Sequence, residues 1–351
     1  MKKQPLEIQT LYSELTERLV AYEAARAIGY ARGTFVTKTI KGNVYYYFQH
    51  SEPGGGKRQL YIGPKDANLD RVVEAYGVSK EILSTEVDSI ERLCTLLRAG
   101  DALVTDAPSA RVLRGLSDAG VFHIGGVLVG THAYTVLGNV LGVSWSGTAL
   151  RTQDVDVAAH KTLEVAVDSS ASVSVPDALE SLRMGFLPVP GLDPSSASTS
   201  FKVRGQGLRV DLLTPVRGDH TEQPVRVERL GAAAQPLRFL DYLIDGPVRG
   251  AVVNGGGILV NVPRPARFAI HKLILASERP VTTHVKRGKD LAQAAEVLGT
   301  LVEERPGDVG QAWRDLLEYG RSYVRRAQQG LAALEKRDAG VAEQVQAEIG
   351  A

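Results

Sequence analysis

Two aspartates separated by one residue, Asp154 and Asp156, have the types and spacing that most clearly indicate chemistry in this chain. They stand in Gln153-Asp-Val-Asp-Val157, which alternates as a β-strand does. Because side chains alternate between the faces of a strand, we expect both carboxylates on one face. Neighbouring carboxylates repel each other, and a divalent cation removes that penalty. Mg²⁺ is commonly held by one or two carboxylates together with substrate phosphates, so the pair indicates a magnesium site.

A third aspartate, Asp211, lies in the later apolar run that begins at Leu208. An aspartate between Val210 and Leu212 is unusual unless it faces a site. The Asp-x-Asp pattern alone is short enough to arise by chance, with both side chains simply solvated. The third carboxylate in a second apolar strand favours a metal site.

A glycine and a threonine, Gly130 and Thr131, end an apolar segment upstream of the aspartates, and we expect a helix from Ala133. Glycine lets backbone N–H groups and a helix N-terminus approach a phosphate, and Thr131 adds a hydroxyl group. A tight strand-to-helix turn would also need glycine. The order strand, Gly-Thr, helix, strand with Asp-x-Asp, strand with Asp is much more specific than any of its parts.

This order resembles the DNA polymerase β-type nucleotidyltransferase superfamily. The segments 128–134 and 151–157 are similar to a bacterial group of stand-alone nucleotidyltransferase-fold proteins and, more distantly, to AbiE-type toxin nucleotidyltransferases. The resemblance covers roughly residues 120–300. Thr131 stands where the family usually has serine or glycine, and the gap between Gly130 and Asp154 is longer than in the smallest members.

The resemblance implies a mechanism with two Mg²⁺ ions, for which Mn²⁺ may substitute as the cofactor. Asp154 and Asp156 would hold both ions, and Asp211 would hold the catalytic ion and help to activate the acceptor hydroxyl. It also implies nucleotide-binding roles for Gly130 and Thr131. Arg151, just before the Asp-x-Asp strand, is a further candidate for nucleotide binding.

A basic helix is expected after Arg264, and a second helix begins near Arg287. Toxin-type relatives carry a similar lysine and arginine series here, which implies that Lys272 contacts the triphosphate and that Arg279 belongs to the nucleotide site. Lys289 with Asp290 would support it. The alternative is a solvated helix face with ordinary charges. Relatives often have another aspartate three residues later, where this chain has Gln293.

The N-terminal part predicts a helix over residues 7–30 and then a three-stranded antiparallel sheet whose turns contain Gly42 and the run 53–56. Basic and aromatic side chains alternate in it, and such a sheet can stack on bases and contact phosphates. The alternative is that aromatic residues favour strands and half of them form a small core. The candidate nucleic-acid-binding residues are Lys38, Lys41, Tyr45, Tyr47, Lys57 and Arg58.

Three functions remain open. The first is transfer of an NMP from an NTP to a macromolecular hydroxyl, an RNA 3′ end or a protein side chain, with a toxin-like role, an antitoxin partner or a homodimer as options. The second is an antibiotic-type enzyme acting on a small molecule, which would not need the N-terminal extension. The third is a non-catalytic nucleic-acid-binding protein on the same scaffold, which would not need three clustered carboxylates.

The expected fold class is α+β: a nucleotidyltransferase core with a mixed sheet and flanking helices. We expect an N-terminal helix and sheet over 1–66, a helical connector over 67–119, the core over 120–262 and a helical region over 263–351. The 351 residues have 44% apolar content and a net charge of +1, which argues against a protein that is basic throughout. One cysteine, Cys94, excludes an internal disulfide. No run approaches the roughly 18 apolar residues of a membrane helix, and we expect a cytoplasmic protein.

Overall fold

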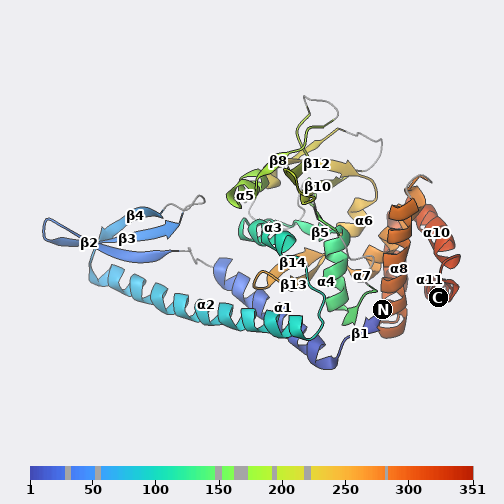
Figure 1. Ribbon diagram of the computed structural model, residues 1–351, viewed down its shortest axis with the longest axis horizontal. Coiled ribbons are helices and arrows are strands. Elements are labelled where there is room, and N and C mark those ends of the chain that lie inside the picture. Colours follow the sequence, from blue (N-terminus) through green and yellow to red (C-terminus); the bar gives the residue numbers. More distant parts are fainter. Residues whose placement is uncertain are drawn as a thin grey trace.

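A computed structural model describes residues 1–27, 33–51, 57–146, 152–161, 173–191, 196–216, 223–280 and 284–350. The chain forms a body and a projecting arm (Figure 1). The body contains the central sheet and its covering helices. The arm contains a small sheet on one half of a long helix.

The central sheet is mixed and has seven strands, in the order β11-β12-β10-β7-β5, with β9 and β8 added beside β10. Strand β10 runs parallel to β7 and β12, whereas β5 is antiparallel to β7 and β9 is antiparallel to β10. The strands are β5 (Val127–Val129), β7 (Asp154–Ala158), β8 (Phe186–Pro188), β9 (Ser200–Val203), β10 (Arg209–Pro215), β11 (Val225–Val227) and β12 (Ala232–Leu237). A mixed sheet with flanking helices agrees with the expected α+β core.

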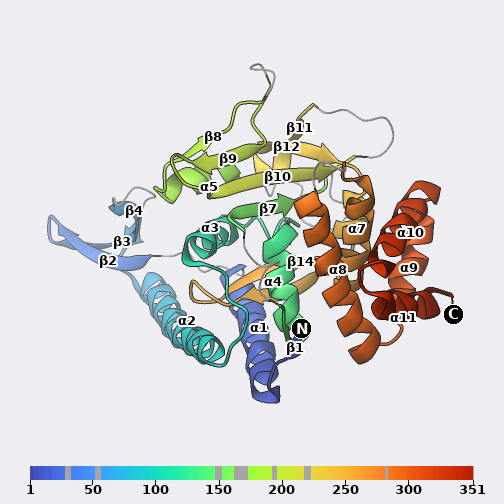
Figure 2. The ribbon, with the colours of Figure 1, turned by 45° about the vertical axis from the view of Figure 1, so that its right-hand side comes forward.

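Short helices and a hairpin surround this sheet (Figure 2). They are α3 (Ala107–Asp118), α4 (Gly130–Val140), α5 (Val175–Ser181), α6 (Leu240–Ile244), β13 (Val248–Val252) and β14 (Ile258–Val262). Helix α4 begins at Gly130, three residues before the expected position. The sequence of residues 237–262 predicts short strands, which β13 and β14 confirm in part. Residues 240–244 are helical instead, because this apolar stretch is too short for its periodicity to separate helix from strand.

The C-terminal region is helical, as expected. Its helices are α7 (Pro265–Glu278), α8 (His284–Glu304), α9 (Asp308–Glu318), α10 (Arg321–Glu335) and α11 (Ala339–Gly350). Helix α7 is buried along most of its length and packs against α8 and α10. Buried Arg267 connects it to two carboxylates, with 2.8 Å from Nη1 to Asp245 Oδ2 and 2.8 Å from Nη2 to Asp315 Oδ2. These ion pairs connect α7 to the end of α6 and to α9.

The N-terminal segment is part of the body. Strand β1 (Lys2–Lys3) pairs with β6 (Val143–Ser144), and helix α1 (Leu6–Ala27) packs against β13 and the end of α2. A second apolar core, which includes Leu15, Leu19 and Leu97, fills this junction. Arg18 Nη1 lies 3.1 Å from Glu86 Oε1 and links α1 to α2 across it.

The arm consists of β2 (Thr34–Ile40), β3 (Asn43–Ser51), β4 (Lys57–Pro64) and helix α2 (Ala67–Ala99). The strands form an antiparallel sheet in the order β2-β3-β4, which confirms the predicted meander. Asp66 caps α2, because its side chain accepts hydrogen bonds from the Asn68 and Leu69 N–H groups. The 33 residues of α2 span about 50 Å, and the sheet covers only the first half. Within the described residues, no helix is long and apolar enough to cross a membrane.

Candidate active site

The three aspartates lie on adjacent strands of the central sheet. Asp156 on β7 is in register with Asp211 on β10 and, on its other side, with Val129 on β5. Along β7, Val155 and Val157 are fully buried, whereas Asp154 is exposed and Asp156 is half-buried. The two β7 carboxylates therefore occupy the face opposite the valines, as the period of a strand requires.

Gly130 lies directly against Asp156. A Cβ atom at this position would be 2.2 Å from Asp156 Oδ2, and the backbone φ of +68° is one that other residues rarely adopt. Helix α4 begins at this glycine and has no side chain that caps its first turn. Its first N–H groups and the positive end of its dipole therefore lie next to the carboxylates, where a phosphate could bind.

Asp156 lies in an environment that disfavours its charge. Burial raises the pKa of its carboxyl to about 7, and the neighbouring Asp211 and Asp154 raise this pKa further, whereas Lys272 and Arg209 oppose the shift. The protein therefore concentrates negative charge at this point of the sheet. A cation bound here would offset both the free-energy cost of burying the Asp156 charge and the repulsion between the carboxylates.

Asp211 has two partners on its own sheet. Arg209 Nε donates to Asp211 Oδ1 over 2.7 Å, and the Ser200 hydroxyl donates to the same oxygen. The Arg209 Nη2 group donates to Ser200 Oγ over 2.8 Å and closes a triangle. Within the part of the chain that the structure describes, no three His, Cys, Asp or Glu side chains are assembled as a metal-binding group.

A set of basic residues on α7 and α8 stands beside the aspartates. Lys272 is only 8% exposed, and its Nζ lies 2.9 Å from Asp290 Oδ1. The other oxygen of Asp290 lies 2.5 Å from Arg279 Nε. Burial would raise the pKa of Asp290, but Lys272 and Arg279 outweigh it and lower the pKa overall. Asp290 thus remains charged and holds both cations in place.

Lys289 of α8 is influenced electrostatically by the aspartates. Burial and Lys272 lower the pKa of its ammonium group, while the negative charges of Asp290, Asp154 and Asp156 act in the opposite direction. The ammonium group therefore lies in the field of both β7 carboxylates. The support role of Lys289 and Asp290 stays a prediction.

One cavity of about 370 Å³ lies between some of these groups. Gly130 and Asp156 line it from the central sheet, and Lys272 and Arg279 line it from α7. Its remaining wall comes from β5, β10, the segment 237–243 and α7, and it is largely apolar, with Arg238, His271 and Glu278 as its polar members. The apolar lining residues are Val129, Leu213, Leu237, Phe239, Leu240, Leu243, Phe268 and Leu275. Apolar walls with a few convergent polar groups, at this volume, are typical of a small-molecule site.

A family model described as Nucleotidyltransferase matches residues 107–318, which is more than half of the chain. The chain belongs to this nucleotidyltransferase family. Among solved structures, an antigenic nucleotidyltransferase-like protein from Paracoccidioides brasiliensis is similar at 14% identity and a TM-score of 0.37, over 69% of this chain and 94% of that one. A search of curated proteins found no match. The family confirms the expected superfamily, whereas the likeness to AbiE-type toxins stays a prediction.

The remaining predicted nucleotide-binding residues of this nucleotidyltransferase differ in how the structure places them. Thr131 is buried, and its carbonyl oxygen accepts a hydrogen bond from Thr135 Oγ1 within α4. Arg151 lies outside the described residues. The six candidate nucleic-acid-binding residues all stand on the arm, away from the aspartates (Figure 1).

Sequence reasoning missed three features of the nucleotidyltransferase site. Arg209 stands two residues before Asp211, so the strand period places both on one face, and this signal was readable. Ser200 reaches Asp211 only through the register of β9 with β10, which no motif shows. Phe239 lines the cavity from a left-handed backbone conformation, with a φ of +66°, which its residue type does not indicate.

Proposed function

We propose that this nucleotidyltransferase transfers a nucleoside monophosphate from an NTP to a hydroxyl group of a macromolecule and releases pyrophosphate. The observation that carries the proposal is one cavity that Gly130 and Asp156 line from one side and Lys272 and Arg279 line from the other. Negative side chains for a cation and positive side chains for a triphosphate thus meet across one nucleotide-sized space.

The donor set fits Mg²⁺. Among the described residues the three carboxylates are not assembled as a ligand group, but they stand on two paired strands and have the hard oxygen atoms that this ion prefers. Burial and the neighbouring carboxylates raise the pKa of Asp156, and a bound cation would offset both effects. Asp154 and Asp156 would hold the ions together with Asp211. Arg209 and Ser200 both donate to Asp211 Oδ1, so Oδ2 is the oxygen that we propose for the metal. Bound Mg²⁺ would stabilise the attacking and leaving oxygens of an in-line displacement.

The chain's own residues would bind and orient the reactants. Lys272, Arg279 and Lys289 would offset the charge of the triphosphate, and the first turn of α4 at Gly130 would contact a phosphate through its N–H groups. The apolar wall would hold the base and exclude water. The acceptor oxygen would form a bond to the α-phosphorus while the bond to the β-phosphate oxygen breaks. The acceptor proton would pass to Asp211, and pyrophosphate would leave along the basic wall.

Transfer of label from α-³²P NTPs tests the reaction class. The full-length protein is incubated with Mg²⁺ and each NTP in turn, together with total RNA, a protein extract or an aminoglycoside. We expect label on RNA or on protein. Label on the aminoglycoside alone would instead establish the antibiotic-type reaction. No transfer to any acceptor, with NTP and Mg²⁺ binding also absent by calorimetry, would contradict an enzymatic role for the site.

A further inference from the structure

The arm's sheet has two faces with different surroundings. One face packs against α2 through an aromatic cluster: Phe35 contacts Phe48 with ring centroids 5.1 Å apart, and both contact Tyr76 of α2. On the same face, the Tyr46 hydroxyl donates to Asp70 Oδ1 over 2.6 Å. A small antiparallel sheet needs one covered face for stability, and α2 supplies that cover.

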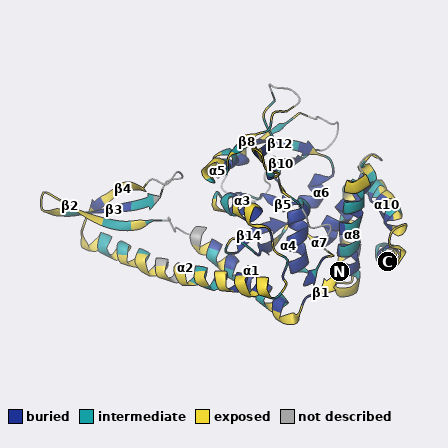
Figure 3. Ribbon diagram, viewed as in Figure 1, coloured by how far each residue is buried: buried dark blue, intermediate teal, exposed yellow. Residues whose placement is uncertain are grey.

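The opposite face, which we call the open face, carries a row of tyrosines. Tyr61 lies between Tyr47 and Tyr45, with ring centroids 5.5 Å and 6.0 Å away. Tyr61 is 57% exposed, and Tyr45 and Tyr47 are half-buried. The Lys38 ammonium group lies 4.8 Å from the centre of the Tyr47 ring. In Figures 1 and 3, none of the helices and strands described for the body covers this face. These rings are therefore not needed to fill a core.

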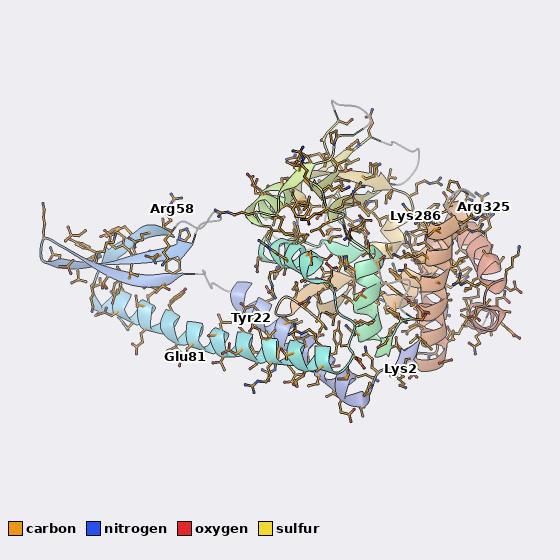
Figure 4. All side chains as sticks on the ribbon, in the orientation of Figure 1. Lys2, Tyr22, Arg58, Glu81, Lys286 and Arg325 are labelled. Carbon is orange, nitrogen blue, oxygen red and sulfur yellow. The ribbon has the colours of Figure 1, made fainter. Side chains whose placement is uncertain are left out.

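Charge is distributed unevenly across the arm. Among the described residues of its strands, 34–51 and 57–64, there is no aspartate or glutamate. Lys38 belongs to the open face by its ring contact, and Lys57 shares the alternation of Gln59 and Tyr61 along β4. Lys41 is exposed at the β2–β3 turn, and Arg58 projects from β4 (Figure 4). Helix α2, behind the sheet, carries acidic residues such as Asp70 and Glu74.

We propose that the open face of the arm binds single-stranded RNA. Exposed tyrosine rings stack on unpaired bases, and lysines beside them contact the phosphates, which is the combination that sequence-tolerant single-strand binders use. An acidic peptide would use the lysines but not the row of rings. A duplex would hide the bases from the rings. Tyrosine hydroxyls can also bond to the 2′-hydroxyl of RNA.

This inference rests on the proposed function in one respect, which is that the bound RNA is the acceptor. The arm projects on a helix of about 50 Å, and the carboxylates lie in the body. The arm would hold the RNA at a distance from the reacting 3′ end and raise the local concentration of that end. The loss of arm contacts should then raise the KM for RNA and leave the KM for NTP unchanged.

Fluorescence anisotropy with a labelled 12-nucleotide oligouridine tests the binding. Tyr47→Ala with Tyr61→Ala removes two rings, and Lys38→Glu with Lys57→Glu reverses two charges. We expect each pair to weaken binding about tenfold or more at low salt. Lys336→Glu with Arg337→Glu also reverses two exposed charges, just after α10 on the side of the body away from the arm, and should alter binding less than about twofold. Circular dichroism of each variant checks that the arm remains folded.

The same measurement separates this inference from the proposed function. Asp154→Asn with Asp156→Asn should bind the oligouridine as the wild-type protein does, since these residues lie in the body. If the wild-type protein transfers no label to RNA but the arm variants lose RNA binding, the arm inference stands and the proposed acceptor falls. Unchanged binding in both arm variants would overturn the inference, and so would tighter binding to duplex RNA or to single-stranded DNA of matched sequence.

Discussion

The central sheet of the body and the sheet of the arm differ in what their polar side chains contact. In the body, Asp156 stands beside Asp211 on the adjacent strand, and burial with this repulsion raises its pKa to about 7. In the arm, the described strands carry basic charge without any acid, and the tyrosines of one face remain open. The body therefore holds carboxylates that repel one another in a partly buried cluster, which suits a cation and an anionic substrate. The arm spreads its charges over a surface, which suits a polymer.

The largest effect should follow from removing the charge of the β7 carboxylates. Asp154→Asn or Asp156→Asn should lower NMP transfer about a thousandfold or more, because metal-assisted stabilisation of the transition state contributes several kcal/mol. Initial rates with α-³²P NTP measure this loss. Asp177→Asn, on the exposed side of α5, is the matched control and should retain the wild-type rate. Comparable rates in all three variants would remove the aspartates from the chemistry.

Disrupting the buried ion pair between Lys272 on α7 and Asp290 on α8 should lower the free energy of unfolding. Asp290→Asn leaves Lys272, which is 8% exposed, without its charge partner, and should cost about 2–4 kcal/mol of unfolding free energy. Urea denaturation followed by tryptophan fluorescence measures this cost. Lys272→Met combined with Asp290→Leu should recover part of it, because neither charge then remains buried alone. A single variant as stable as the wild-type protein would show that Asp290 has no structural role.

Alanine substitutions at two glycines with positive φ should distinguish the effect of backbone strain from the effect of a side chain that contacts the site. Gly130 and Gly185 have φ values of +68° and +77°, but only a Cβ at Gly130 would meet Asp156. Each change to alanine should cost about 1–2 kcal/mol of stability. Only Gly130→Ala should also weaken Mg²⁺ binding and transfer, about tenfold or more, because the methyl group displaces the carboxylate. Isothermal calorimetry and the transfer assay together distinguish the two outcomes. Equal activity of both variants would contradict the close approach.

The pH dependence of stability should report on Asp156. Its folded-state pKa of about 7 lies above the ordinary value of 3.8, so the folded protein keeps a proton that the unfolded chain has released. The stabilisation from this proton is complete below pH 4 and is lost as the pH rises through 7. Asp156→Asn should therefore gain stability relative to the wild-type protein between pH 4 and pH 8, by at least about 1 kcal/mol.

Thermal melts without divalent cations measure this difference, and Glu343→Gln on the surface of α11 is the control. Saturating Mg²⁺ at pH 8 should raise the stability of the wild-type protein more than that of Asp156→Asn. A difference in melting temperature between the two proteins that stays constant with pH would show that the pKa of Asp156 is not raised in the folded protein.

Local sequence patterns predicted much of both sheets. The period of a strand placed Asp154 and Asp156 on one face, and turn residues such as Gly42 predicted the meander of the arm. The helical C-terminal region followed from apolar periodicity. Each of these features depends on residues that are close together in the chain.

The positions of residues that are distant in the chain but adjacent in the fold could not be predicted from the sequence. The register that sets Asp211 beside Asp156, and Ser200 beside Asp211, depends on how distant strands pair. The apolar wall near Phe239 comes from a segment that we expected to be a strand and that contains a short helix. The predicted roles of Lys272 and Arg279 came from resemblance, and their shared ion pair with Asp290 came only from the packing of α7 on α8.

The smallest expected effect compares the two faces of the arm. Tyr61→Ser on the open face should change the free energy of unfolding by no more than about 0.5 kcal/mol, because a side chain that is 57% exposed contributes little packing. Phe48→Leu on the covered face should cost about 1 kcal/mol or more, since Phe48 contacts both Phe35 and Tyr76. Hydrogen exchange of β3 and β4 measures both changes locally. If Tyr61→Ser were the more damaging, the tyrosine row would be a core of the arm rather than a surface kept for a ligand.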